Sequence, residues 1–190
     1  MGTPELYDLF PNAKLLLIDP LSESSTYILE HLQNRDVSFY NCAVGDRAGT
    51  EKIHVQDEIS SSSILVPSSI NFEHNASDQR AIQVKTLDSI YENEKNLGKL
   101  GIKIDTEGFE LNVIKGAREA LKAAEFVLAE VRHNHESFLG VYKLHEFVAE
   151  MHKHGFVLSM ILTAKPFIAD LCFQPIKRLE DSQVQASGMV

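Results

Sequence analysis

Three acidic side chains stand directly after short apolar runs. Asp19 follows the run 14–18, and Asp105 and Glu107 follow the run 100–104. An acid at the carboxyl end of a strand can accept hydrogen bonds from the vicinal hydroxyls of a ribose. Paired carboxylates in a cleft can raise one pKa and prepare a general base, or can hold a cation or an ammonium group. Asp19 is therefore a candidate ribose ligand, and Asp105 with Glu107 is a candidate reactive pair.

The same acids also have a purely structural interpretation. Asp19-Pro20 is typical of a strand that simply ends, with the Asp19 carboxylate capping a turn. A helix is expected to begin near Phe109, and acids at a helix N-terminus are stabilised by the helix dipole, which would account for Glu107 and Glu110. The residue types alone leave both interpretations open.

Two histidines, His133 and His135, follow the apolar run 126–131. At the end of a strand, His133 could act as a base or contact a substrate. The two rings would share a face of an extended segment, and Asp105 could join them as metal ligands. No further ligand has a telling spacing, so the sequence predicts that the chain holds no metal.

Strand-like and helix-like segments alternate along the chain. Continuous apolar runs predict strands buried on both faces, and apolar residues three and four apart predict helices. The expected strands are 14–18, 37–44, 52–56, 82–85, 100–104, 126–131, 156–162 and 167–173. The expected helices follow Ser22, run from near Phe109 to Leu121, and run from Val141 to Met151 before Gly155.

This alternation predicts an α/β fold, a three-layer sandwich with a mostly parallel, Rossmann-like sheet. The short turn at Lys165-Pro166 makes the last two strands an antiparallel hairpin. In such sheets a ligand binds beyond the carboxyl ends of the strands, where the candidate acids stand.

Composition excludes several classes of protein. The 190 residues fit a single domain, 1–190, with a frayed tail from about 180 to 190. A net charge of −9 argues against a nucleic-acid partner, which requires a basic face. No apolar run is long enough for a membrane span and no signal peptide opens the chain, so we expect a cytoplasmic protein that does not insert into membranes. Cys42 and Cys172 are expected to be small apolar residues, not a disulfide.

Taken in order, these segments resemble the FkbM family of S-adenosylmethionine-dependent methyltransferases. The central part of the resemblance is carried by 86–90 (TLDSI), 102–110 (IKIDTEGFE), 113–117 (VIKGA) and 126–131 (FVLAEV). The family's second, third and last strand ends are similar to 17–20 (LIDP), 41–46 (NCAVGD) and 170–173 (DLCF). The resemblance spans nearly the whole chain, and the ordered set is far more specific than any one piece.

The resemblance implies a Class I methyltransferase fold that binds S-adenosylmethionine. Asp19 would hold the ribose, the segment 43–46 would border the adenine, and Asp105 would face the methionine end. The cofactor-binding residues implied in this way are Gly2, Asp19, Pro20, Ala43, Val44, Asp46 and Asp105.

The activity implied by the resemblance is methylation of a hydroxyl oxygen on a small molecule, sugar or glycan. Such an enzyme aligns a nucleophilic oxygen with the sulfonium methyl while a base removes the hydroxyl proton. Glu107, placed beside the transferred methyl, and His133 are the candidate bases, and Asp105 completes the catalytic set.

One part of the family pattern is missing. The first strand and its glycine-rich turn should precede the first helix, yet this sequence opens with Met1-Gly2-Thr3-Pro4. Thr3 can cap a helix, Pro4 suits its first position, and Gly2 resembles the last glycine of the missing turn. We expect a start further upstream or a truncated chain.

Two other functions compete with the enzyme. The chain could be a catalytically inactive remnant of the fold that acts as a binding or structural protein, and its open sheet edge could pair with a second copy to form a homodimer. A nucleotide-binding oxidoreductase is a weaker alternative, because the sequence contains no G-x-G-x-x-G.

Overall fold

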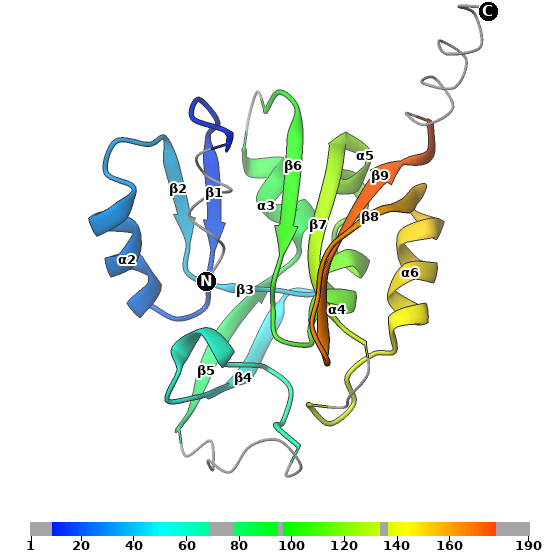
Figure 1. Cartoon of the computed structure of the whole chain (residues 1–190). Coiled ribbons are helices and arrows are strands. Elements are labelled where there is room, and N and C mark those ends of the chain that lie inside the picture. Colours follow the sequence, from blue (N-terminus) through cyan, green and yellow to red (C-terminus); the bar gives the residue numbers. More distant parts are fainter. Residues whose placement is uncertain (1–8, 69–77, 95–96, 134–136, 178–190) are drawn as a thin grey trace, which may run out of the picture.

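The computed structural model describes residues 9–68, 78–94, 97–133 and 137–177 (Figure 1). The helices are α2 (Glu23–His31), the 3-10 helix η1 (Ile59–Ser61), α3 (Leu87–Asn93), α4 (Glu110–Lys115), α5 (Arg118–Ala123) and α6 (Leu144–Lys153). The strands are β1 (Leu15–Ile18), β2 (Val37–Tyr40), β3 (Ala43–Val44), β4 (Gly49–Val55), β5 (Asp78–Lys85), β6 (Leu100–Ile104), β7 (Ala124–Arg132), β8 (Phe156–Ala164) and β9 (Ile168–Pro175). Gly2, His135 and the expected tail from about residue 180 lie outside these ranges.

The strands form three sheets, in the orders β1-β2, β3-β5-β4 and β6-β7-β9-β8. The pairs β1–β2, β3–β5 and β6–β7 are parallel, whereas β4–β5, β7–β9 and β8–β9 are antiparallel. The α/β class and the closing antiparallel hairpin are as predicted. The described residues do not form the expected single, mostly parallel sheet, because they fall into three sheets, two of which combine parallel and antiparallel pairs.

A tight turn divides the strand expected at 37–44. The backbone N–H of Cys42 donates to the carbonyl of Tyr40 at 2.9 Å, so the chain bends sharply at Asn41. Strand β2 pairs with β1 before this turn, and β3 pairs with Val84 and Lys85 of β5 after it. The segment is largely apolar on both sides of Asn41, so the sequence does not indicate that the pairing partner changes there.

The helix expected from Phe109 to Leu121 is also divided. Gly116 ends α4, and a Cβ at this position would overlap the carbonyl oxygen of Gly45. Helix α5 then begins, and the Asp88 carboxylate accepts hydrogen bonds from its Glu119 and Ala120 backbone N–H groups at 2.8 and 2.9 Å. The close approach of the Gly45 backbone and the cap that Asp88 of α3 provides therefore divide the expected helix into α4 and α5.

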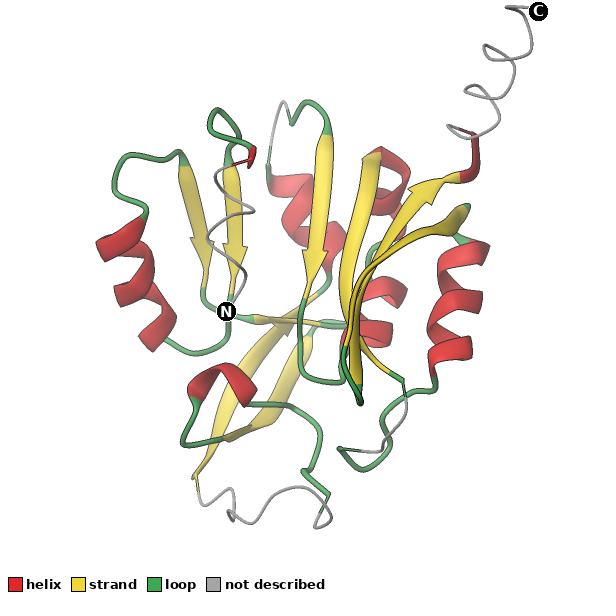
Figure 2. Ribbon diagram, viewed as in Figure 1, coloured by secondary structure: helices red, strands yellow, loops and turns green. Residues whose placement is uncertain are grey.

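Helices cover one face of the sheet that contains β6 and β7. Ile102 and Ile104 are buried, whereas Gly101 and Lys103, which alternate with them, are exposed. The main core joins these strands to α3, α4, α5 and α6, and Figure 2 shows α6 alongside β8 and β9. In the described residues the opposite face is partly open and carries charged side chains, so β6 is not the doubly buried strand of a three-layer sandwich.

Strands β1 and β6 each have one unpaired edge among the described residues. β1 pairs only with β2, and β6 pairs only with β7. Figure 1 shows the arrowheads of β1, β2 and β6 pointing to the same edge of the molecule, where the candidate acids follow the strands. No helix in the described ranges is long and apolar enough to cross a membrane.

Candidate functional site

A buried carboxylate holds the loop that follows β6. Glu110, the first residue of α4, is 1% exposed. Its Oε1 accepts hydrogen bonds from the Thr106 backbone N–H (2.9 Å), the Thr106 hydroxyl (3.1 Å) and the Gly108 backbone N–H (3.0 Å). Its Oε2 accepts from the Tyr142 hydroxyl at 2.8 Å. Glu110 thus fixes the shape of the loop that carries both candidate acids, beyond favouring the start of a helix.

Glu107 has an unusual backbone conformation within this loop. Its φ is 51°, and that of Gly108 is 98°, so two successive residues are left-handed. The buried Ser63 hydroxyl donates to the Glu107 carbonyl at 2.7 Å and anchors the loop from the segment after β4. Left-handed non-glycine residues are uncommon and persist where surrounding contacts hold them. This conformation carries the Glu107 side chain towards strand β7.

The Glu107 carboxylate forms an ion pair with Arg132, the last residue of β7. Burial raises the pKa of Glu107 above its ordinary value, Arg132 lowers it, and Asp105 raises it again, with a net upward shift. The Arg132 guanidinium lies over the Phe138 ring, 4.9 Å from its centroid, and approaches the Ser137 hydroxyl at 3.3 Å. Arg132 is therefore held on several sides, and it orients the Glu107 carboxylate.

Three carboxylates gather at the ends of β6 and β7. One oxygen each from Asp105, Glu107 and Glu130 lies within 4.8 Å of the others. Lys103 approaches Asp105 at 3.3 Å and Asp170 at 3.8 Å, and neutralises part of the negative charge. Burial and the nearby Asp105 charge raise the pKa of Glu130. Such a cluster can hold a divalent cation or an ammonium group, and exposed acidic groups are also common without either.

Asp19 shows the turn-capping geometry that the sequence left open. It follows β1, and its Oδ1 accepts the Leu21 backbone N–H at 2.7 Å. Burial raises the pKa of Asp19, while the hydrogen bonds from Leu21 and Ser24 lower it. The carboxylate is at the carboxyl end of β1 next to Pro20, so the structural role coexists with the position expected of a ribose ligand.

The expected adenine border lies after the turn that redirects the chain. Ala43 and Val44 are buried in β3, and Asp46 is exposed beyond them. The Gly45 backbone N–H donates to the Lys85 carbonyl at 2.9 Å, which holds this strand end against β5. Ala43 and Val44 belong to the packed core, and Asp46 is the member of the set most available to a ligand.

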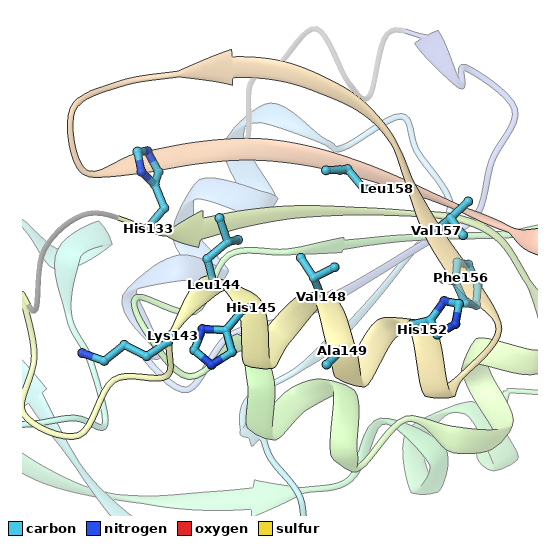
Figure 3. Close-up of a pocket in the computed structure, with 10 residues that line it drawn as sticks. All are labelled: His133, Lys143, Leu144, His145, Val148, Ala149, His152, Phe156, Val157 and Leu158. Carbon is cyan, nitrogen blue, oxygen red and sulfur yellow. The ribbon is translucent and has the colours of Figure 1, made fainter.

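His133 lies apart from the carboxylate cluster. Its Nε2 is 3.0 Å from the Lys165 carbonyl oxygen in the β8–β9 turn, so the tautomer protonated at Nε2 donates there. Its ring lines a groove beside α6 (Figure 3). The structure therefore brings Asp105 and Glu107 together, and it ties His133 to the hairpin instead.

Residues 6–158, more than half of the chain, match the methyltransferase FkbM domain. The chain belongs to the FkbM methyltransferase family. Asp19, the segment 43–46, the acidic cluster and His133 all fall within the matched residues. The resemblance first seen in the strand-end motifs is therefore confirmed.

No curated protein matches this FkbM-family chain. Among solved structures, it is similar to LaPhzM with a TM-score of 0.45 and 12% sequence identity. The similarity covers 90% of this chain and 46% of LaPhzM, so the chain spans about half the length of that protein.

Several site residues of this FkbM-family chain escaped sequence reasoning. Glu130 falls within the expected strand 126–131, and no role was assigned to Arg132 or Ser63 from the sequence. The register of β6 against β7 pairs Ile104 with Ala129, which sets Asp105 beside Glu130. Glu130 and Arg132 are two positions apart, so on a strand their side chains lie on the same face. This spacing is the sequence signal that would have indicated a charged face on β7.

The donor set fits the cofactor expected of an FkbM-family protein. The cluster of Asp105, Glu107 and Glu130 matches a cationic group, and Asp19 offers a carboxylate for hydroxyls. Asp105 is exposed and Lys103 lies beside it, so this cluster is on the partly open face at the strand ends.

Proposed function

We propose that this chain carries out methyl transfer from S-adenosylmethionine to a hydroxyl oxygen of a small molecule, sugar or glycan. The observation that carries the proposal is the cluster of Asp105, Glu107 and Glu130 at the carboxyl ends of two parallel strands, within the residues that match the family. A parallel sheet offers its ligand site at this edge.

The proposed cofactor contacts divide between two strand ends. Asp19 would accept hydrogen bonds from the ribose hydroxyls, and Asp46 with the neighbouring Val44 would border the adenine. Asp105 and Glu130 would attract the positively charged methionine end. When bound, the cofactor supplies an electrophilic methyl group on a sulfonium.

Glu107 is the base that the geometry favours. Arg132 engages its Oε2, so Oε1 is the oxygen that would accept the proton of the acceptor hydroxyl. Burial and the Asp105 charge raise the pKa of Glu107, which makes its carboxylate a stronger proton acceptor. His133 is less suited, because its ring is held by the Lys165 carbonyl and lines the surface beside α6, whereas the carboxylate cluster is formed by Asp105, Glu107 and Glu130.

The test is methyl transfer from labelled S-adenosylmethionine to a panel of sugars and glycans, with Glu107→Gln compared with wild type. We expect the substitution to lower the rate by about 10²–10⁴-fold, which is the usual contribution of a general base. Binding of S-adenosylhomocysteine should change much less. Unchanged transfer by Glu107→Gln would exclude it as the base.

A catalytically inactive binding protein is the second candidate. The Glu107–Arg132 ion pair favours it, because a carboxylate held by arginine is a poorer base. This function predicts that the chain transfers no methyl group to any acceptor in the panel, whether or not it binds S-adenosylhomocysteine.

A further inference from the structure

One peptide unit of the loop after β6 is held at both of its ends. The carbonyl of Glu107 accepts the Ser63 hydroxyl at 2.7 Å. The backbone N–H of the same peptide, which belongs to Gly108, donates to the Glu110 carboxylate at 3.0 Å. The two groups lie in one planar unit and point in opposite directions, so rotating the peptide would break both hydrogen bonds. Ser63 and Glu110 therefore fix its orientation together.

The orientation of this peptide is coupled to the conformation of Glu107. It sets ψ of residue 107 and φ of residue 108, and the φ angles of Glu107 and Gly108 are 51° and 98°. Glycine adopts positive φ angles readily, whereas a left-handed glutamate is strained and relaxes where its neighbours allow it. Glu107 is thus the residue that needs support, and the Ser63 hydroxyl contacts its own carbonyl.

Ser63 is itself fixed to strand β4. Its backbone exchanges two hydrogen bonds with His54, at 2.8 and 3.2 Å, and the residue is 1% exposed. The hydroxyl that donates to Glu107 also accepts the Leu65 backbone N–H at 3.0 Å. Leu65 in turn packs over Gly108, where an added Cβ would lie 3.2 Å from the Leu65 side chain. Ser63 is therefore a rigid support whose hydroxyl is used both as a donor and as an acceptor.

The neighbouring Ser62 provides a matched comparison within the same segment. Its hydroxyl accepts the Gln56 backbone N–H at 3.1 Å. This hydrogen bond stays within the segment that follows β4, whereas the one donated by Ser63 reaches the loop after β6. Removing either hydroxyl weakens the segment, and only the removal of the Ser63 hydroxyl releases the Glu107 carbonyl.

We propose that Ser63 is a positioning residue for Glu107. Its hydroxyl keeps the peptide between residues 107 and 108 turned so that Glu107 stays left-handed and its carboxylate lies beside Arg132, within the acidic cluster. The consequence for methyl transfer rests on the proposed function, in which Glu107 is the base. The conformational role does not depend on it.

The conformational test compares Ser63→Ala with Ser62→Ala by nuclear magnetic resonance. A strong cross-peak between a residue's own amide and α protons marks a left-handed residue, and wild type and Ser62→Ala should both show it at Glu107. Ser63→Ala should lose it, and its Gly108 amide should exchange about tenfold faster or more, because a strained residue relaxes once its support is removed. In the Glu107→Gly background, Ser63→Ala should alter Gly108 exchange much less, since glycine stays left-handed without strain.

The catalytic test applies if wild type transfers methyl. Ser63→Ala should then lower kcat by about 10²-fold, which is the cost of a small misplacement of a reacting group, with the affinity for S-adenosylhomocysteine little changed. Ser62→Ala should keep the wild-type kcat. If wild type transfers no methyl, the proposed function fails, and the resonance and exchange measurements alone decide the conformational role of Ser63.

Circular dichroism of each variant ensures that folded samples are compared. The proposal is overturned if folded Ser63→Ala keeps the left-handed cross-peak at Glu107, or if Ser63→Ala and Ser62→Ala do not differ in Gly108 exchange or in a measurable kcat. If Ser63→Ala does not fold, its combination with Glu107→Gly should still fold, because residue 107 no longer needs the support. Failure of both to fold would give Ser63 a purely structural role and would also overturn the proposal.

Discussion

Replacing Glu110 should destabilise the chain in a graded manner that depends on which hydrogen bonds the substitute can keep. The wild-type carboxylate is 1% exposed and accepts four hydrogen bonds from Thr106, Gly108 and Tyr142. Glu110→Ala removes every acceptor. The two hydroxyl donors can rotate towards other partners, whereas the two backbone N–H groups are fixed by the loop.

The expected magnitude follows from those two N–H groups. Each buried donor left without a partner costs about 1–3 kcal/mol, and water entering the vacated space recovers part of that cost. We therefore expect Glu110→Ala to lower the free energy of unfolding by about 3–4 kcal/mol. Glu110→Gln keeps an oxygen for Thr106 and Gly108 and loses mainly the charge, so about 1 kcal/mol is expected.

The assay is urea unfolding followed by circular dichroism, with hydrogen exchange at the Thr106 and Gly108 amides. Tyr142→Phe serves as the matched variant, because it removes a single hydrogen bond to Oε2 and should cost about 1 kcal/mol. Both amides should exchange much faster in Glu110→Ala than in Glu110→Gln. Equal destabilisation by the alanine and glutamine variants, or unchanged exchange at both amides, would refute the role assigned to Glu110.

Three further predictions concern charge, close packing and the sheet edge. Burial and the nearby Asp105 charge raise the pKa of Glu130, so its ionised form disfavours folding and stability falls as pH rises through that pKa. Glu130→Gln should therefore stabilise the chain modestly at pH 7, by less than full burial would imply because solvent screens the half-exposed carboxylate, and should lose this advantage below about pH 4, the ordinary pKa of a glutamate; pH-dependent unfolding would measure both. Gly116→Ala would overlap the Gly45 carbonyl and should cost about 2–3 kcal/mol in urea unfolding, whereas Gly49→Ala, with open space around it, should cost little; equal effects would contradict the close approach. The homodimer expected from an open sheet edge is tested at β8, an edge strand of the sheet β6-β7-β9-β8: if a second copy pairs there, Met160→Lys, at a position 57% exposed, should shift the light-scattering mass towards the monomer, and a mass that is already monomeric in wild type would exclude this dimer.

Strand positions were predictable where an apolar run stops at a polar residue. The bounds of Leu100–Ile104 match the prediction, and its apolar residues recur at alternate positions, as burial of one strand face requires. The closing hairpin also matches, because the short turn at Lys165 allows only an antiparallel return. The divisions at Asn41 and Gly116 could not be predicted. The division at Gly116 depends on the approach of the Gly45 backbone, and the division at Asn41 accompanies a change of pairing from β1 to β5; both involve segments distant in sequence.

The sequence indicates two acids of the candidate site, but it does not indicate which residues they contact. Asp105 and Glu107 stand out because charged residues directly follow a buried strand. The roles of Arg132 and Glu130 come from the register between β6 and β7, which no local spacing encodes. His133 was given a chemical role from its strand-end position alone, and the hairpin turn that engages its ring was not visible in sequence.

The most direct test of the proposed cofactor site is calorimetric titration of S-adenosylhomocysteine into the wild-type chain and into Asp19→Ala, with the exposed Asp57→Ala as the control. The proposal predicts saturable binding to wild type and to the control, and a loss of about tenfold or more in affinity for Asp19→Ala. Absence of binding to a folded wild-type sample, or equal binding by Asp19→Ala and Asp57→Ala, would contradict it.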